Sequence, residues 1–72
     1  MHDKYKITFI NAVIRAFAKH FNLDAQSAFR YLWNFNGIKF LIEYYDIEHL
    51  QSIDDAVDDL MALCQKNGGK LA

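Results

Sequence analysis

The chain has 72 residues, enough for one domain over residues 1–72, and 53% of them are hydrophobic. A single cysteine excludes an internal disulfide, and no apolar stretch approaches the roughly 20 residues that cross a membrane, so we expect a soluble cytoplasmic protein. The net charge of −1 is unevenly distributed, because residues 1–39 sum to +4 and residues 40–72 to −5. Such opposed charges favour a charged partner or a second copy.

Residues 4–21 have the spacing of a long amphipathic helix. Val13 and Phe17 belong to a wide apolar stripe, whereas Arg15 and Lys19 fall on the opposite face. The same polar positions interrupt the first apolar run, so we expect no signal peptide.

A second helix is predicted over residues 25–35. Asp24 is a typical N-cap, and the periodicity places Phe29 and Leu32 on the inward face. The connection over residues 22–24 is short, so we expect the first two helices to be antiparallel neighbours.

The Asn36-Gly37 pair separates this helix from the next one. Either residue can adopt the left-handed conformation that ends a helix, glycine without a Cβ penalty. A third, short helix is predicted over residues 38–45, with a single apolar stripe made by Ile38, Leu41, Ile42 and Tyr45.

The last helix is predicted over residues 53–66. Ser52 is its expected N-cap, and acidic residues crowd its first two turns, where a helix dipole favours negative charge. Gly68 follows its end. Every apolar run has helical period, so the fold class is all-α, a small bundle of about four helices.

One segment of the chain resembles a family of short bacterial proteins of unknown function. The matching positions are Gly37, Phe40, Leu41, Tyr45, Asp46, His49, Ser52, Val57 and Asp59, and a weaker similarity covers residues 7–63. The resemblance implies an all-helical fold. For some members it also implies a neighbouring protein that is similar to an ADP-ribosyltransferase-type toxin. It brings no catalytic residues.

Asp46 and His49 are the best candidate acid/base pair, because a carboxylate three residues away can orient an imidazole ring. No nucleophile accompanies them, so we interpret the pair as structural, with the His49 ring bonded near Asp46 or to a backbone group. An enzyme is therefore the third of our hypotheses, and we assign no catalytic residue.

Metal and cofactor sites are not predicted. His2, His20, His49 and Cys64 lack the short spacings of metal ligands, and the acidic cluster of the last helix lacks the pattern of a calcium loop. Cys64 lies on an apolar stripe and is interpreted as a core residue.

A small DNA-binding regulator that uses the basic first helix is the alternative function. Residues 27–45 are similar to a helix-turn-helix, but the second helix of that unit offers Lys39 against Glu43 and few side chains that read bases. Nucleic acid is therefore not the favoured partner.

The first hypothesis is a non-catalytic protein-binding module, antitoxin-like or regulatory as the resemblance implies. One tryptophan, four tyrosines and six phenylalanines exceed what so small a core encloses. The expected partner is a toxin-like protein or a second copy, not a membrane. The residues expected to contact it are Trp33, Phe40, Tyr44, Tyr45, Asp46, His49, Asp55 and Asp59.

Overall fold

The structure is a computed structural model that describes residues 3–69 of the chain. These residues form five helices and no strand, four of the helices having seven residues or more, which confirms the all-α prediction. The helices are α1 Asp3–His20, α2 Ala25–Asn34, α3 Gly37–Glu43, α4 Tyr45–Glu48 and α5 Ile53–Lys66. His2, one of the histidines considered as a metal ligand, lies outside this part. Within it, no helix combines the length and apolarity needed to cross a membrane.

Side-chain caps fix the starts of α2 and α5 where the sequence predicts them. Asp24 Oδ1 accepts a hydrogen bond from the Ser27 amide at 2.7 Å. Ser52 Oγ accepts one from the Asp55 amide at 3.1 Å. Each bond satisfies an amide that has no carbonyl partner within its helix.

Asn36 and Gly37 have different roles in the turn between α2 and α3. Asn36 takes the left-handed conformation, with φ of +67°. Gly37 is buried, and a Cβ placed on it would lie 2.8 Å from Leu32 Cδ2. The asparagine therefore supplies the reversal, whereas the glycine lets α3 start against α2.

The third helix ends earlier than predicted. The sequence predicts one helix over residues 38–45, but α3 stops at Glu43 and Tyr44 has φ of −107°. The Tyr44 carbonyl then accepts from the Glu48 amide at 2.8 Å, which begins α4. Tyr45 thus leaves the stripe of α3 and faces α1.

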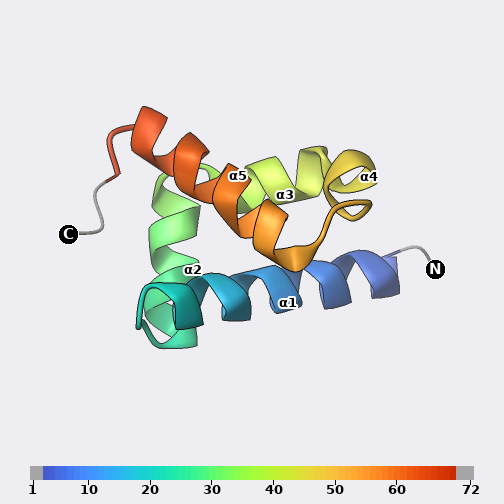
Figure 1. Cartoon of the computed structure of the whole chain (residues 1–72), viewed down its shortest axis with the longest axis horizontal. Helices are drawn as coiled ribbons and strands as arrows, with labels where there is room; N and C mark the ends of the chain where they lie inside the picture. Colours follow the sequence, from blue (N-terminus) through green and yellow to red (C-terminus); the bar gives the residue numbers. More distant parts are fainter. Residues whose placement is uncertain (1–2, 70–72) are drawn as a thin grey trace.

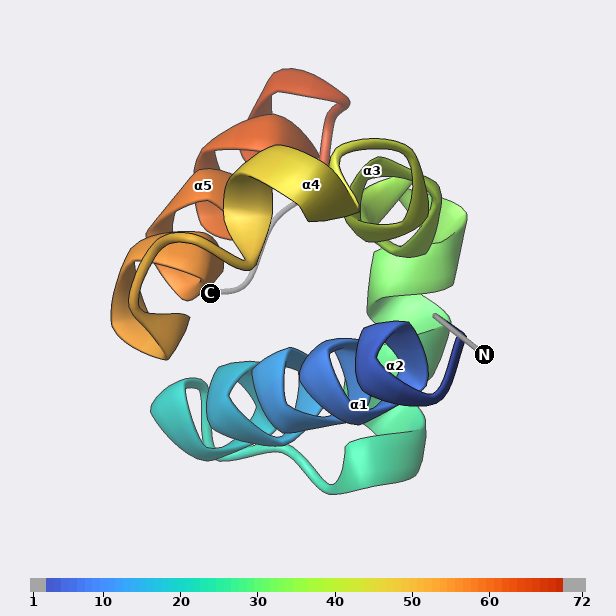
Figure 2. The same cartoon turned by 90° about the vertical axis from the view of Figure 1, so that its right-hand side faces the viewer.

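The path of α2 differs from the expected antiparallel pairing. Figure 1 shows α2 leaving the C-terminal end of α1 at a steep angle, and Figure 2 shows a similarly steep angle between the two helices. The apolar stripe of α1 contacts α3 and α5 as well as α2, so α2 cannot lie along it. The largest fully buried side chains come from these four helices and are Phe17, Leu32, Leu41, Leu60, Val13 and Cys64. Cys64 is in the core, as predicted.

Candidate protein-binding surface

Exposed apolar side chains gather on α2 and α3. Trp33 is 64% exposed, Phe29 44% and Ile42 47%. Phe29 and Trp33, one turn apart on α2, stack with ring centroids 6.0 Å apart. The sequence places Phe29 inward, and this is wrong, because the steeply crossing α2 buries only Ala28 and Leu32.

Trp33 joins two hollows into one continuous surface. One, of about 370 Å³, lies on α2 and is lined by Gln26, Phe29, Arg30 and Trp33. The other, of about 440 Å³, extends onto α3 and is lined by Trp33, Asn36, Ile38, Lys39, Ile42 and Glu43. We call the surface made by Phe29, Trp33, Ile38 and Ile42 the α2–α3 surface.

Charged side chains border the α2–α3 surface without covering it. Lys39 Nζ and Glu43 Oε1 form an ion pair at 3.8 Å, and both side chains are at least half exposed. Such a pair contributes little to stability. Arg30 lines the hollow on α2. An apolar centre with a charged border is the usual arrangement of a protein interface.

Phe40 and Tyr44 lie on another side of α3. Their rings are 5.2 Å apart, and both line a hollow of about 230 Å³ shared with Leu63 and Asn67 beside α5. Phe40 is half-buried and Tyr44 is exposed. Asn36, Lys39 and Glu43 line both this hollow and the one beside Trp33, so the Phe40–Tyr44 pair adjoins the α2–α3 surface across these polar side chains.

Tyr45 and His49 form a compact unit against α1. The His49 ring stacks on Tyr45 with centroids 4.5 Å apart, and its Nδ1 lies 2.7 Å from the Tyr45 carbonyl oxygen. The Tyr45 ring packs edge-on against Phe9 at 5.6 Å. His49 thus has a backbone partner, one of the two predicted arrangements. It does not bond to Asp46, whose side chain is exposed.

The two predicted contact residues on α5, Asp55 and Asp59, have different environments. Asp55 is exposed on the first turn of α5. Asp59 is half-buried, and its Oδ2 accepts a hydrogen bond from Gln51 Nε2 at 3.0 Å. Asp59 therefore belongs to a hydrogen-bond network with Gln51, whereas the Asp55 side chain is exposed.

That network contains Glu48, a buried carboxyl that sequence reasoning missed. Glu48 is 4% exposed, its Oε2 accepts from Gln51 Nε2 at 2.9 Å, and its Oε1 is buried without a partner. Burial raises the pKa of Glu48 to about 7, and the Asp59 carboxyl adds to this rise through a hydrogen bond and its negative charge. The sequence around Glu48 does not predict its burial, because that burial depends on packing near α5, where Asp59 lies.

Glu48 is not among the residues that line the three hollows described above. Burial also raises the pKa of the Cys64 thiol to about 11, which keeps it protonated. Among the side chains that the structure describes, no group of three His, Cys, Asp or Glu is placed to hold a metal ion.

Comparison with known proteins places the chain in a family. The family model described as "Protein of unknown function (DUF3791)" matches residues 8–67. No curated protein matches significantly, and neither does any solved structure. The matched region runs from the first turns of α1 through the end of α5 and includes the whole α2–α3 surface. The chain therefore belongs to the DUF3791 family of proteins of unknown function.

Proposed function

We propose that this protein is a non-catalytic protein-binding module whose α2–α3 surface docks on another protein. The observation that carries the proposal is Trp33, which is 64% exposed and borders both hollows of that surface. Tryptophan is enriched among residues that dominate binding energy, because it buries a large area and loses little rotamer entropy.

The rest of the surface supports this role. Phe29 and Ile42 extend the apolar contact on either side of Trp33, and none of the three belongs to the buried core. Removing them from water on binding is favourable by roughly 25 cal/mol for each Å² of apolar surface. A partner with two or three apolar side chains in a row would fill both hollows.

An ADP-ribosyltransferase-like toxin is the partner that we propose to test first. The basis is the resemblance of residues 37–59 to a family of which some members occur beside such a toxin, and this protein would then act as the antitoxin-like or regulatory member of the pair. Binding, without chemistry, would mask part of the toxin's surface.

The experiment measures binding of the purified protein to a purified ADP-ribosyltransferase-like toxin, by isothermal titration calorimetry. Trp33→Ala should weaken binding by about 2 kcal/mol or more, roughly 30-fold in Kd. Tyr5→Ala is the matched control, because Tyr5 is 68% exposed on α1, away from both hollows. Equal loss in the two variants would contradict a role for the α2–α3 surface. Salt-dependent binding to duplex DNA in place of the protein would favour the DNA-binding alternative.

A further inference from the structure

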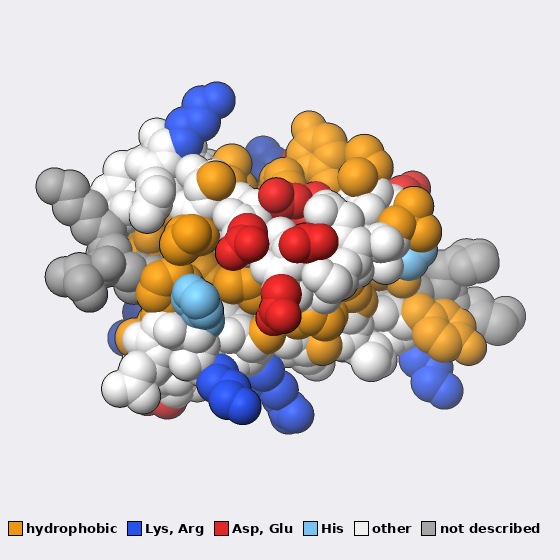
Figure 3. Space-filling model, in the orientation of Figure 1, with side chains coloured by type: hydrophobic (Ala, Val, Ile, Leu, Met, Phe, Trp, Pro, Cys, Tyr) orange, Lys and Arg blue, Asp and Glu red, His pale blue; other side chains and the backbone are white. Residues whose placement is uncertain are grey.

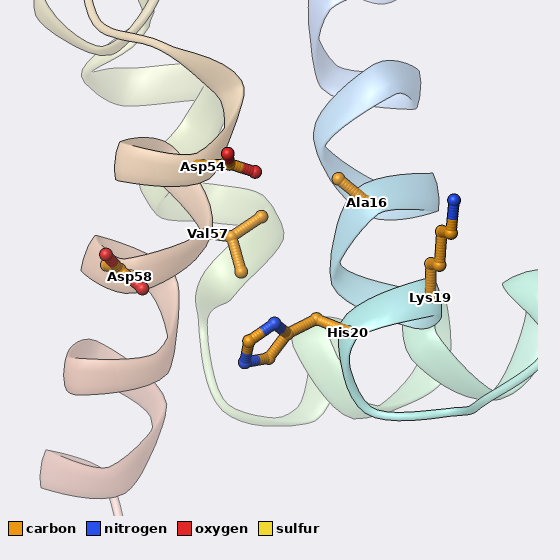
Figure 4. Close-up of a pocket in the computed structure, with 6 residues that line it drawn as sticks. All are labelled: Ala16, Lys19, His20, Asp54, Val57 and Asp58. Carbon is orange, nitrogen blue, oxygen red and sulfur yellow. The ribbon is translucent and has the colours of Figure 1, made fainter.

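A second surface, between α1 and α5, carries opposite charges on its two sides. The groove encloses about 540 Å³ and is lined by Ala16, Lys19, His20, Asp54, Val57 and Asp58. Figure 4 shows the His20 ring directed toward α5 and the Asp54 carboxylate directed toward α1, with Ala16 and Val57 between the helices. The α1 side is therefore basic, the α5 side acidic and the middle apolar.

The charges of this groove form no ion pair with any other side chain that the structure describes. In the part of the chain that the structure describes, the ion pair formed is Lys39 with Glu43 on α3. Lys19, Asp54 and Asp58 are all exposed. Figure 3 shows the same face, with acidic side chains over α5, basic side chains along α1 and hydrophobic ones beside them. Each side of the groove is thus available to a charged group from another molecule.

A second copy of this chain has the complementary charges in the required order. Rotation by a half turn about an axis along the groove exchanges the basic and the acidic side. When two copies face each other in this way, Lys19 of one copy meets Asp58 of the other, and the same contact forms twice. The net charges of the two halves of the chain agree with this arrangement. Residues 1–39, which contain α1, sum to +4, and residues 40–72, which contain α5, sum to −5.

We propose that the α1–α5 groove is a self-association surface, on which a second copy docks about a two-fold axis so that α1 of each copy lies against α5 of the other. Helix dipoles favour Asp54 and Asp58 near the start of α5 and Lys19 near the end of α1. All three side chains are exposed, so they can pair with charges of another molecule. Because the apolar middle is small, the contact depends mainly on charge, and dissolved salt weakens it.

The test is a charge exchange followed by sedimentation equilibrium at low and at high salt. Wild-type protein should self-associate at low salt and dissociate as salt is added. Lys19→Glu and Asp58→Lys should each abolish association when studied alone, because both two-fold contacts become repulsive. An equimolar mixture of the two variants should associate again, because one contact has both charges reversed and the other keeps native Lys19 and Asp58.

Matched controls distinguish an effect of the groove from an effect of net charge. Lys4→Glu on α1 and Lys66→Glu on α5 reverse a charge outside the groove lining, as Lys19→Glu does within it, and they should keep wild-type association. Thermal melts check that every variant is folded, and Asp54→Lys replaces Asp58→Lys if the latter does not fold. Trp33→Ala should leave self-association unchanged, which keeps this test independent of the proposed function.

Three results would overturn the proposal. The first is a wild-type protein that stays monomeric at low salt up to the concentrations used for nuclear magnetic resonance. The second is a mixture of the two charge variants that fails to associate. The third is loss of self-association in Trp33→Ala, which would move the contact to the α2–α3 surface. If wild type is monomeric and the groove variants weaken binding of the toxin-like protein, the groove takes that protein instead of a second copy.

Discussion

Replacing Glu48 by glutamine should make the protein more stable at neutral pH. The Glu48 carboxyl is 4% exposed, and its pKa rises from the ordinary value of 4.5 to about 7. The native state therefore keeps this proton up to about pH 7, whereas the unfolded chain loses it near pH 4.5. Between these values the native state binds more protons, so raising the pH lowers the free energy of unfolding.

The size of the effect follows from the shift in pKa. A tenfold change in acidity corresponds to about 1.4 kcal/mol, so a rise from 4.5 to about 7 costs the native state up to about 3 kcal/mol once Glu48 is ionised. The cost is absent below pH 4.5, grows between pH 4.5 and 7, and is complete above pH 7. In a domain with a total stability of roughly 5–10 kcal/mol, this is a large share.

Glu48→Gln removes the ionisation and keeps the shape of the side chain. Its amide oxygen can accept from Gln51 as Glu48 Oε2 does, and its amide nitrogen can donate a hydrogen bond where Glu48 Oε1 has no partner. Urea unfolding followed by circular dichroism should give nearly equal stabilities for variant and wild type at pH 4.5. Above pH 7 the variant should be more stable by up to about 3 kcal/mol.

Glu43→Gln is the matched control for this experiment. Glu43 is half exposed in its pair with Lys39, and its replacement should leave the pH dependence of wild type in place. Parallel stability curves for wild type and Glu48→Gln would refute the reasoning, as would a Glu48→Gln variant that is less stable at every pH. Parallel curves would mean that Glu48 ionises in the native state without cost, whereas lower stability at every pH would mean that the glutamine amide fits this position less well than the carboxyl group.

Two further substitutions test the local structure. Gly37→Ala should lower the free energy of unfolding by about 1–3 kcal/mol, because its Cβ would meet Leu32 Cδ2 at 2.8 Å; a urea midpoint equal to that of wild type would show that Leu32 can move aside. His49→Ala should cost about 1 kcal/mol in thermal melts, since the ring is exposed but bonds to the Tyr45 carbonyl. Unchanged melting together with lost partner binding would instead make His49 a binding residue.

The helices that carry their own stop and start signals could be predicted from the sequence. For α2 and α5 the predicted bounds agree with the structure to within one residue. Their caps, Asp24 and Ser52, bond to amides three residues away, so the information lies in adjacent residues. The end of α3 has no such signal. The sequence therefore predicts a helix that continues to Tyr45, whereas α3 ends at Glu43.

The sequence predicts that some aromatic side chains are exposed, but it does not predict which of them lie next to each other. An excess of aromatic residues indicated exposed ones, and Trp33 and Tyr44 are exposed. Whether Phe29 is covered depends on the angle at which α2 crosses α1, and that angle results from competition among three helices for the same stripe of α1. Helical periodicity describes one helix at a time, so it cannot predict how several helices pack on the same stripe.

The sequence by itself determined the all-α fold, the capped helices and the separation of positive from negative charge along the chain, because each depends on composition or on residues a few positions apart. Only the tertiary structure decided which surfaces face water. It buried Glu48 beside Asp59, and it set Lys19 and His20 across a groove from Asp54 and Asp58. These groups come together through contacts between α1, α4 and α5, and burial and electrostatic coupling depend on distance in space, not on separation along the chain.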